Sequence, residues 1–134
     1  SIALGLKSVK EFPAEVQVWN ELGIAYMEDG QKVEAARIFT KATEVGAMSA
    51  DTVYPYYNLG RLASETSDDK VAIAYLRKAL ACNPTHGWAH QYLAKALERQ
   101  GQKAEAIAEY RAAIKAKPGF TEARDALSRL GAHP

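Results

Sequence analysis

The sequence has little of several features that would assign it to a particular class. It holds a single cysteine, Cys82, so no disulfide can form within the chain and the redox compartment stays open. No apolar run approaches the roughly 18–20 residues that a membrane-spanning helix needs. The net charge is only +1, from 17 basic and 16 acidic residues, which argues against nucleic-acid binding through a basic face. The remaining composition, 48% hydrophobic and 25% charged, is that of an ordinary globular chain.

Apolar residues recur at the spacing of an amphipathic helix. Trp19, Leu22 and Tyr26 follow the i, i+3, i+7 pattern of one helix face. Gly23 lies in the middle of this helix, where glycine costs roughly 1 kcal/mol relative to alanine. A helix tolerates that cost when a second helix must approach closely, and the small residue Ala35 is the expected partner position.

The same pattern returns toward the C-terminus. The turn that begins at Gly30 reads GQKVEA, and the turn that begins at Gly101 reads GQKAEA. Pro84 and Pro118 are 34 residues apart. This period, together with the Trp-x2-Leu-Gly-x2-Tyr spacing, resembles the tetratricopeptide repeat (TPR) family. The resemblance covers nearly the whole chain and implies an all-α fold, a right-handed α-solenoid of antiparallel helix pairs.

The repeat frame divides the chain into one TPR domain of three full repeats with a helix at each end. We expect the second helix of a truncated repeat first, so that the chain is a fragment of a longer protein; a lone capping helix is the alternative. The last helix is expected to cap the array. The predicted parts are 1–13 for the truncated repeat, 16–47, 53–84 and 87–118 for the full repeats, and 121–131 for the capping helix.

Residues 47–52 depart from this frame. Ala47 stands where a closing proline is expected, and about three extra residues follow. We expect Asp51 to cap the next helix, which places Pro55 in the first turn, where its missing N–H costs least.

Few residues suggest chemistry. His86 and His90 are four apart and could share a helix face as a metal pair, but no third ligand has suitable spacing. Gly87 stands where a zinc protease has its glutamate. Cys82 has no catalytic partner nearby in the sequence. The sequence therefore predicts a protein that is not an enzyme and that uses no metal and no cofactor.

The TPR resemblance also implies a function and a site. In that family the first helix of each repeat lines a concave groove where ligands lie, so we expect a scaffold that binds a peptide or partner segment there. The groove positions combine aromatic rings with arginine and lysine, a composition typical of binding hot spots. For Tyr54 and Tyr57 the alternative is packing against neighbouring helices. The predicted ligand-binding residues are Asn20, Tyr54, Tyr57, Asn58, Arg61, Trp88, Gln91, Tyr92, Lys95 and Arg99.

One TPR subclass binds the C-terminal carboxylates of chaperones in a clamp of lysine, asparagine and arginine. Of the corresponding places in this sequence, only the one held by Asn58 carries the required residue. The other places hold Asn20, Ile24, Trp88 and Tyr92. The sequence therefore disfavours a carboxylate clamp.

Two further functions stay open. The domain could be a structural or self-assembly module, docking through an apolar edge formed by Ile2, Leu6 and Val9. It could also be the non-catalytic regulatory domain of a larger enzyme, an alternative that rests only on the start within a helix. In every case the expected partner is a protein or peptide, with no nucleic acid and no membrane insertion.

Overall fold

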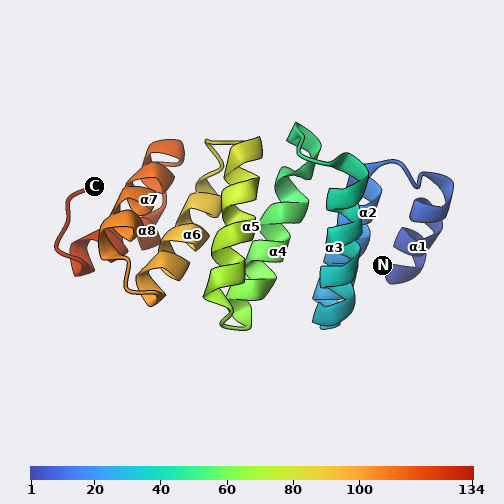
Figure 1. Ribbon diagram of the computed structural model, residues 1–134, viewed down its shortest axis with the longest axis horizontal. Helices are drawn as coiled ribbons and strands as arrows, with labels where there is room; N and C mark the ends of the chain where they lie inside the picture. The colour runs from blue at the N-terminus through green and yellow to red at the C-terminus, as the bar shows by residue number, and fades with distance from the viewer.

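The computed structural model describes residues 1–134 and is all-α, with eight helices placed side by side along the long axis of the molecule (Figure 1). A single turn of 3-10 helix, η1, interrupts the series. None of the helices is both long and apolar enough to span a membrane. The elements are α1 (Ile2–Glu11), α2 (Val16–Glu28), α3 (Lys32–Gly46), η1 (Ala50–Thr52), α4 (Val53–Glu65), α5 (Asp69–Cys82), α6 (Gly87–Arg99), α7 (Lys103–Ala116) and α8 (Thr121–Arg129).

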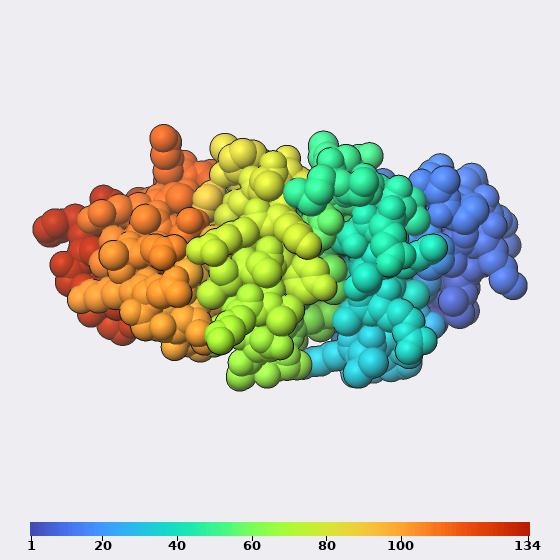
Figure 2. Space-filling model, in the orientation of Figure 1, coloured from blue at the N-terminus to red at the C-terminus, as the bar shows by residue number.

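The helices pack as adjacent antiparallel pairs. The closest packing is within α2–α3, α4–α5 and α6–α7, and each pair then contacts the next along the chain. In the space-filling view the colours therefore follow one another in bands from the N-terminus to the C-terminus (Figure 2). The predicted fold class is confirmed.

Small residues allow the close approach within each pair. A Cβ atom placed on Gly60 of α4 would lie 2.6 Å from Leu76 Cγ of α5, and one on Gly23 of α2 would lie 2.5 Å from the ring of Phe39 in α3. Ala35, the expected partner position, is fully buried, and so is Ala72, which holds the same place in α5. In each pair a large side chain fills the space over the glycine: Leu76 over Gly60 and Phe39 over Gly23. Each of these residues lies one helical turn after the small residue of its helix.

The turns inside the pairs need a left-handed backbone. Gly30 and Gly101 supply it, with φ angles of +83° and +77°, as the repeated GQK motif predicts. Between α4 and α5 the left-handed residue is Ser67, at φ +61°. Asp68 then caps α5, its carboxylate accepting a hydrogen bond from the Val71 N–H at 3.4 Å.

The irregular segment predicted at 47–52 forms the 3-10 turn, but its capping residue differs from the prediction. Thr52, which is fully buried, is the N-cap of α4, and its hydroxyl accepts a hydrogen bond from the Ser49 N–H at 3.1 Å. Asp51 lies within the 3-10 turn and does not cap α4. Pro55 does lie in the first turn of α4.

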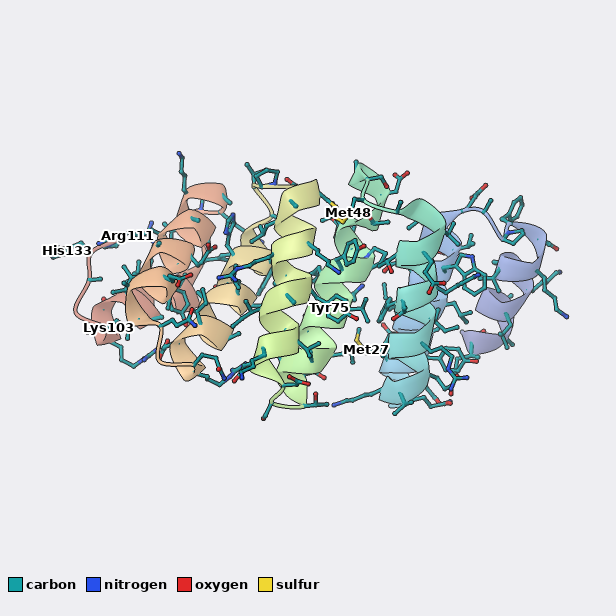
Figure 3. The ribbon with its side chains drawn as sticks, viewed as in Figure 1. Met27, Met48, Tyr75, Lys103, Arg111 and His133 are labelled. Atoms are coloured by element: carbon teal, nitrogen blue, oxygen red, sulfur yellow. The ribbon has the colours of Figure 1, made fainter.

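Most buried apolar side chains belong to two clusters, and both clusters include residues of α4. The larger cluster has 18 residues from α4 to α8. The smaller cluster consists of Ala35 and Phe39 of α3 with Leu59 and Leu62 of α4. Figure 3 shows the labelled side chains of Met27 and Tyr75 in the space between α3 and the α4–α5 pair, where both pack against the smaller cluster.

The two ends of the array differ. At the N-terminal end α1 packs on α2 and buries Val9, which is 8% exposed. The predicted self-association edge is therefore wrong at Val9, whereas Leu6 is 44% exposed. At the C-terminal end α8 buries Ala123 and Leu127. The tail beyond α8 is held by Arg111, whose Nε donates to the His133 carbonyl at 2.9 Å (Figure 3).

A repeated side-chain hydrogen bond ties three helices to the turn before them. In each case the donor lies six residues after a proline and binds that proline's carbonyl oxygen. The donor nitrogens differ chemically: an indole, an imidazole and a guanidinium. The pairs are Trp19 with Pro13 at 2.9 Å, His90 with Pro84 at 2.7 Å and Arg124 with Pro118 at 3.2 Å.

His90 has an acceptor at both ring nitrogens. Nε2 donates to the Pro84 carbonyl, and Nδ1 lies 2.5 Å from Glu109 Oε2 of α7. Two acceptors require two N–H groups, so this arrangement favours the imidazolium. Burial opposes the charge, but the Glu109 carboxylate and the Pro84 carbonyl together raise the pKa of His90 above its ordinary value.

We expect His90 to make the stability of the domain depend on pH. Because its pKa is higher in the folded chain, its contribution to the free energy of unfolding is complete below about pH 6.5 and is lost as the pH rises through the raised value. Urea unfolding of the wild type and His90→Gln, from about pH 5.5 to 8.5, isolates this contribution as the difference between the two curves. Parallel curves over the whole range would contradict the assignment.

The close approach at Gly60 predicts a large cost for any side chain there. Gly60→Val should lower the free energy of unfolding by about 1–3 kcal/mol through overpacking against Leu76. Gly119→Ala is the matched control, because a Cβ on Gly119 has no atom within 4 Å and its φ is not left-handed. Chemical denaturation compares both variants with the wild type, and equal stability of all three would refute the packing argument.

Candidate binding face

The candidate site is the surface made by α2, α4, α6 and α8, which we call the first-helix face. Side-chain hydrogen bonds join these helices across the face. Asn58 Nδ2 of α4 donates to Asn20 Oδ1 of α2 at 3.1 Å, and Gln91 Nε2 of α6 donates to Glu122 Oε2 of α8 at 2.8 Å. These bonds join α2 to α4 and α6 to α8.

A hollow of about 760 Å³ opens on this face between α2 and α4. Of the predicted site residues it includes Asn20 and Tyr54, and the Tyr54 ring is 58% exposed. Its charged residues are all acidic, so the hollow carries a negative potential. The lining residues are Ala14, Glu15, Val16, Gln17, Asn20, Glu21, Ile24, Ala50, Asp51 and Tyr54.

Aromatic rings fill the junction between α4 and α6. The Tyr57 and Tyr92 rings meet edge to face with centroids 5.8 Å apart, and His86 lies 4.9 Å from Tyr57 and 5.5 Å from Tyr54. Burial raises the pKa of Tyr57 to about 12. The predicted residues Tyr54, Tyr57 and Tyr92 are thus brought together in one cluster.

The sequence does not identify His86 as part of this cluster. Its Nδ1 accepts the Ala89 N–H at 3.1 Å, so the ring caps α6. Burial lowers the pKa of His86, which favours the neutral ring beside the tyrosines. His86 and His90 bind separate partners and do not converge on one point. The usable signal was the position of His86 directly before a helix, where a side-chain acceptor is needed.

Two cations lie against the aromatic cluster. Arg61 Cζ is 5.6 Å from the Tyr57 centroid and 5.8 Å from the Tyr92 centroid, and Lys95 Nζ is 5.6 Å from the Tyr92 centroid. These distances are those of cation–π contacts. Lys95 also bonds Glu122 Oε2 at 3.0 Å, whereas Arg61 has no ion pair and its Nε is buried without a partner.

Of three other predicted ligand-binding residues, two are buried and one lies away from the tyrosine cluster. Asn58 is 4% exposed and Gln91 is 1% exposed, so both serve mainly to join helices. Trp88, 44% exposed, lies apart from the tyrosines and packs edge to face on Phe120, at 4.6 Å between centroids.

Arg99 belongs to a structural ion pair. Its guanidinium binds Asp69 Oδ1 at 2.7 and 2.9 Å and the Ser64 hydroxyl at 2.7 Å. These bonds connect α6 to α4 and α5, and Asp69 is only 7% exposed. The hydrogen bonds from Arg99 hold the pKa of Asp69 below its ordinary value.

The first-helix face can therefore hold a ligand by stacking, hydrogen bonding and ion pairing. The structure brings together no group of three histidine, cysteine or acidic side chains that could bind a metal. Cys82 is a half-buried free thiol beside the Thr52 hydroxyl, at 3.6 Å.

Comparison with known proteins establishes the family. Residues 53–86 and residues 70–130 match two sequence profiles, each described as a tetratricopeptide repeat. With the stacked antiparallel helix pairs, these matches show that the chain belongs to the TPR family. No curated protein sequence matches the chain.

Several solved structures share the fold. The crystal structure of MamA is 28% identical and superposes with a TM-score of 0.83, over 96% of this chain and 74% of MamA. The first TPR of Spaghetti (RPAP3), solved bound to the HSP90 peptide SRMEEVD, is 20% identical, with a TM-score of 0.81 over 87% of this chain and 90% of that one. YrrB, described as a TPR protein with an unusual peptide-binding site, is 24% identical, with a TM-score of 0.73 over 91% of this chain and 61% of YrrB.

The Arg99–Asp69 pair predicts a stability effect rather than a binding effect. Arg99→Gln leaves a covered carboxylate without its charged partner and should cost about 1–2 kcal/mol of unfolding free energy, since Arg99 is itself partly exposed. Arg77→Gln is the control, because its pair with Glu105 is more than half exposed on both sides and should change stability by less than about 0.5 kcal/mol. Urea denaturation at pH 7 tests the difference, and equal effects would contradict the structural role.

Proposed function

We propose that the domain binds a peptide segment of a partner protein on its first-helix face, between α2 and α6. The observation that carries the proposal is the position of the 760 Å³ hollow, which is lined mainly by α2 and η1 and includes Tyr54, a member of the aromatic cluster with Tyr57 and Tyr92. An exposed tyrosine and an unpaired arginine on such a surface offer a ligand both apolar area and directed bonds.

The similarity to peptide-binding TPR proteins supports a peptide as the partner class. Spaghetti (RPAP3) was solved with an HSP90 peptide, and YrrB is described as having a peptide-binding site. The mode of binding proposed for this chain differs from a chaperone carboxylate clamp, because Asn58, the one residue that fits the clamp pattern, is buried and bonded to Asn20.

We infer that the domain acts by binding and not by catalysis. The buried polar groups on and near the face connect helices: Asn58 to Asn20, and Arg99 to Asp69. Such bonds make the surface rigid before the ligand arrives, which lowers the entropy that binding must offset. A largely preformed surface of this kind suits recognition of an extended or helical segment.

Selection from a random peptide library displayed on phage tests the proposal. A peptide selected on the wild type should bind Tyr54→Ala about five- to thirtyfold more weakly, the loss of about 1–2 kcal/mol typical of an exposed aromatic anchor. Val33→Ala is the matched control, since Val33 is an exposed apolar residue of α3, outside the face. Fluorescence titration measures the dissociation constants.

Two outcomes would overturn this proposal. One is that no peptide is enriched on the folded wild-type domain. The other is that enriched peptides bind Tyr54→Ala as tightly as they bind the wild type.

A further inference from the structure

The arginines of the chain fall into two groups, those bound to a carboxylate or carbonyl oxygen of the protein and those not. Six of the seven bind an oxygen of the protein, either a carboxylate or a backbone carbonyl. Arg61, on the first-helix face, is the exception: it has no ion pair and no carboxylate or carbonyl partner, and the polar group beside its guanidinium is the Tyr57 hydroxyl. The paired arginines are Arg37 with Glu34, Arg77 with Glu105, Arg99 with Asp69, Arg129 with Glu98, Arg111 with the His133 carbonyl and Arg124 with the Pro118 carbonyl.

Protein side chains position the Arg61 guanidinium without neutralising it. The Tyr57 and Tyr92 rings flank it at 5.6 and 5.8 Å. Its Nε is covered and has no acceptor, a state that costs free energy in a folded protein. The two terminal nitrogens are not among the buried polar atoms that lack a partner, and neither forms an ion pair. The guanidinium therefore rests against an aromatic support with its charge unpaired.

Nearby charges leave this positive centre uncompensated. Lys95, the other cation on the Tyr92 ring, already binds Glu122. Glu65, one turn after Arg61 in α4, binds Lys32 at 3.2 Å. Both carboxylates are thus engaged with lysines, and the Arg61 charge is available to an incoming anion.

We propose, building on the proposed function, that Arg61 binds a carboxylate of the bound peptide through its two terminal nitrogens. A guanidinium and a carboxylate match in geometry and form two parallel N–H···O bonds. The tyrosine rings keep the guanidinium plane fixed and reduce its contact with water, which strengthens the ion pair. The domain then selects peptides with an acidic group at the position that reaches α4.

A carboxylate, with its single negative charge, matches Arg61 better than a phosphoryl group does. A phosphorylated side chain carries about −1.5 to −2 charges and three acceptor oxygens near pH 7. Arg61 is one free cation, and the adjacent Lys95 is already paired. One carboxylate therefore balances the site.

The test repeats the library selection on wild type, Arg61→Gln and Arg61→Glu, with Arg77→Gln as control. The peptides selected on the wild type and on Arg77→Gln should carry Asp or Glu at one fixed position. Peptides selected on Arg61→Gln should lose this preference. Peptides selected on Arg61→Glu should carry Lys or Arg at that position instead. Replacing the selected Asp or Glu by Asn or Gln in the synthetic peptide should weaken wild-type binding about ten- to hundredfold and leave Arg61→Gln binding nearly unchanged. Circular dichroism checks that each variant is folded.

The outcomes separate the two proposals. Peptides enriched without an acidic position, or an acidic preference that persists in Arg61→Gln, overturn the role of Arg61 and leave peptide binding standing. Failure to enrich any peptide overturns both. Titration of the same peptide with a free and with an amidated C-terminus identifies the source of the carboxylate: a tenfold or greater loss on amidation assigns it to the chain end, and no loss assigns it to the acidic side chain.

Discussion

Where Gly60 of α4 faces Leu76 of α5, the helices approach so closely that a methyl group on Gly60 would overlap the leucine side chain. Gly23 and Phe39 make the same contact in the α2–α3 pair. The contact uses only one face of the first helix in each pair, α2 or α4. The second helix of the pair covers that face. Residues on the other faces of the first helix, such as Tyr54 and Arg61, are not needed for packing within the pair and can therefore be polar, aromatic or charged.

Most of the fold could be predicted because it depends on short-range pattern. The 3.6-residue periodicity, the mid-helix Gly23 and the GQK turn each report on local geometry, and the antiparallel helix pairs follow from them. The capping of α4 was predicted wrongly at Asp51, because a 3-10 turn that includes Asp51 precedes the helix and leaves Thr52 as the residue directly before it. Likewise, Trp19, His90 and Arg124 are chemically unlike, so residue type does not reveal their common hydrogen bond; they share only a donor nitrogen and a position six residues after a proline.

The candidate face was less predictable than the fold. Its aromatic residues follow from helix position, so Tyr54, Tyr57 and Tyr92 could be grouped in advance. The partners of its polar residues could not, because they come from helices about 30 or more residues away: Asn58 bonds Asn20, and Arg99 bonds Asp69. A polar side chain faces another helix when such a distant partner lies opposite it, and is otherwise available to a ligand. The spacing of residues in a single sequence does not show which distant residues lie opposite one another.

The division of the apolar core at α4 has a consequence for how the array responds to force and heat. In a linear array, cooperativity is transmitted only through the interfaces between neighbours. The α3–α4 interface holds its own cluster of four buried apolar residues, which shares no member with the eighteen-residue cluster from α4 to α8, so the two parts of the array are coupled through α4 and not through one continuous core. The segment before η1 can therefore lose its structure, or change its tilt, while the helices after it stay folded.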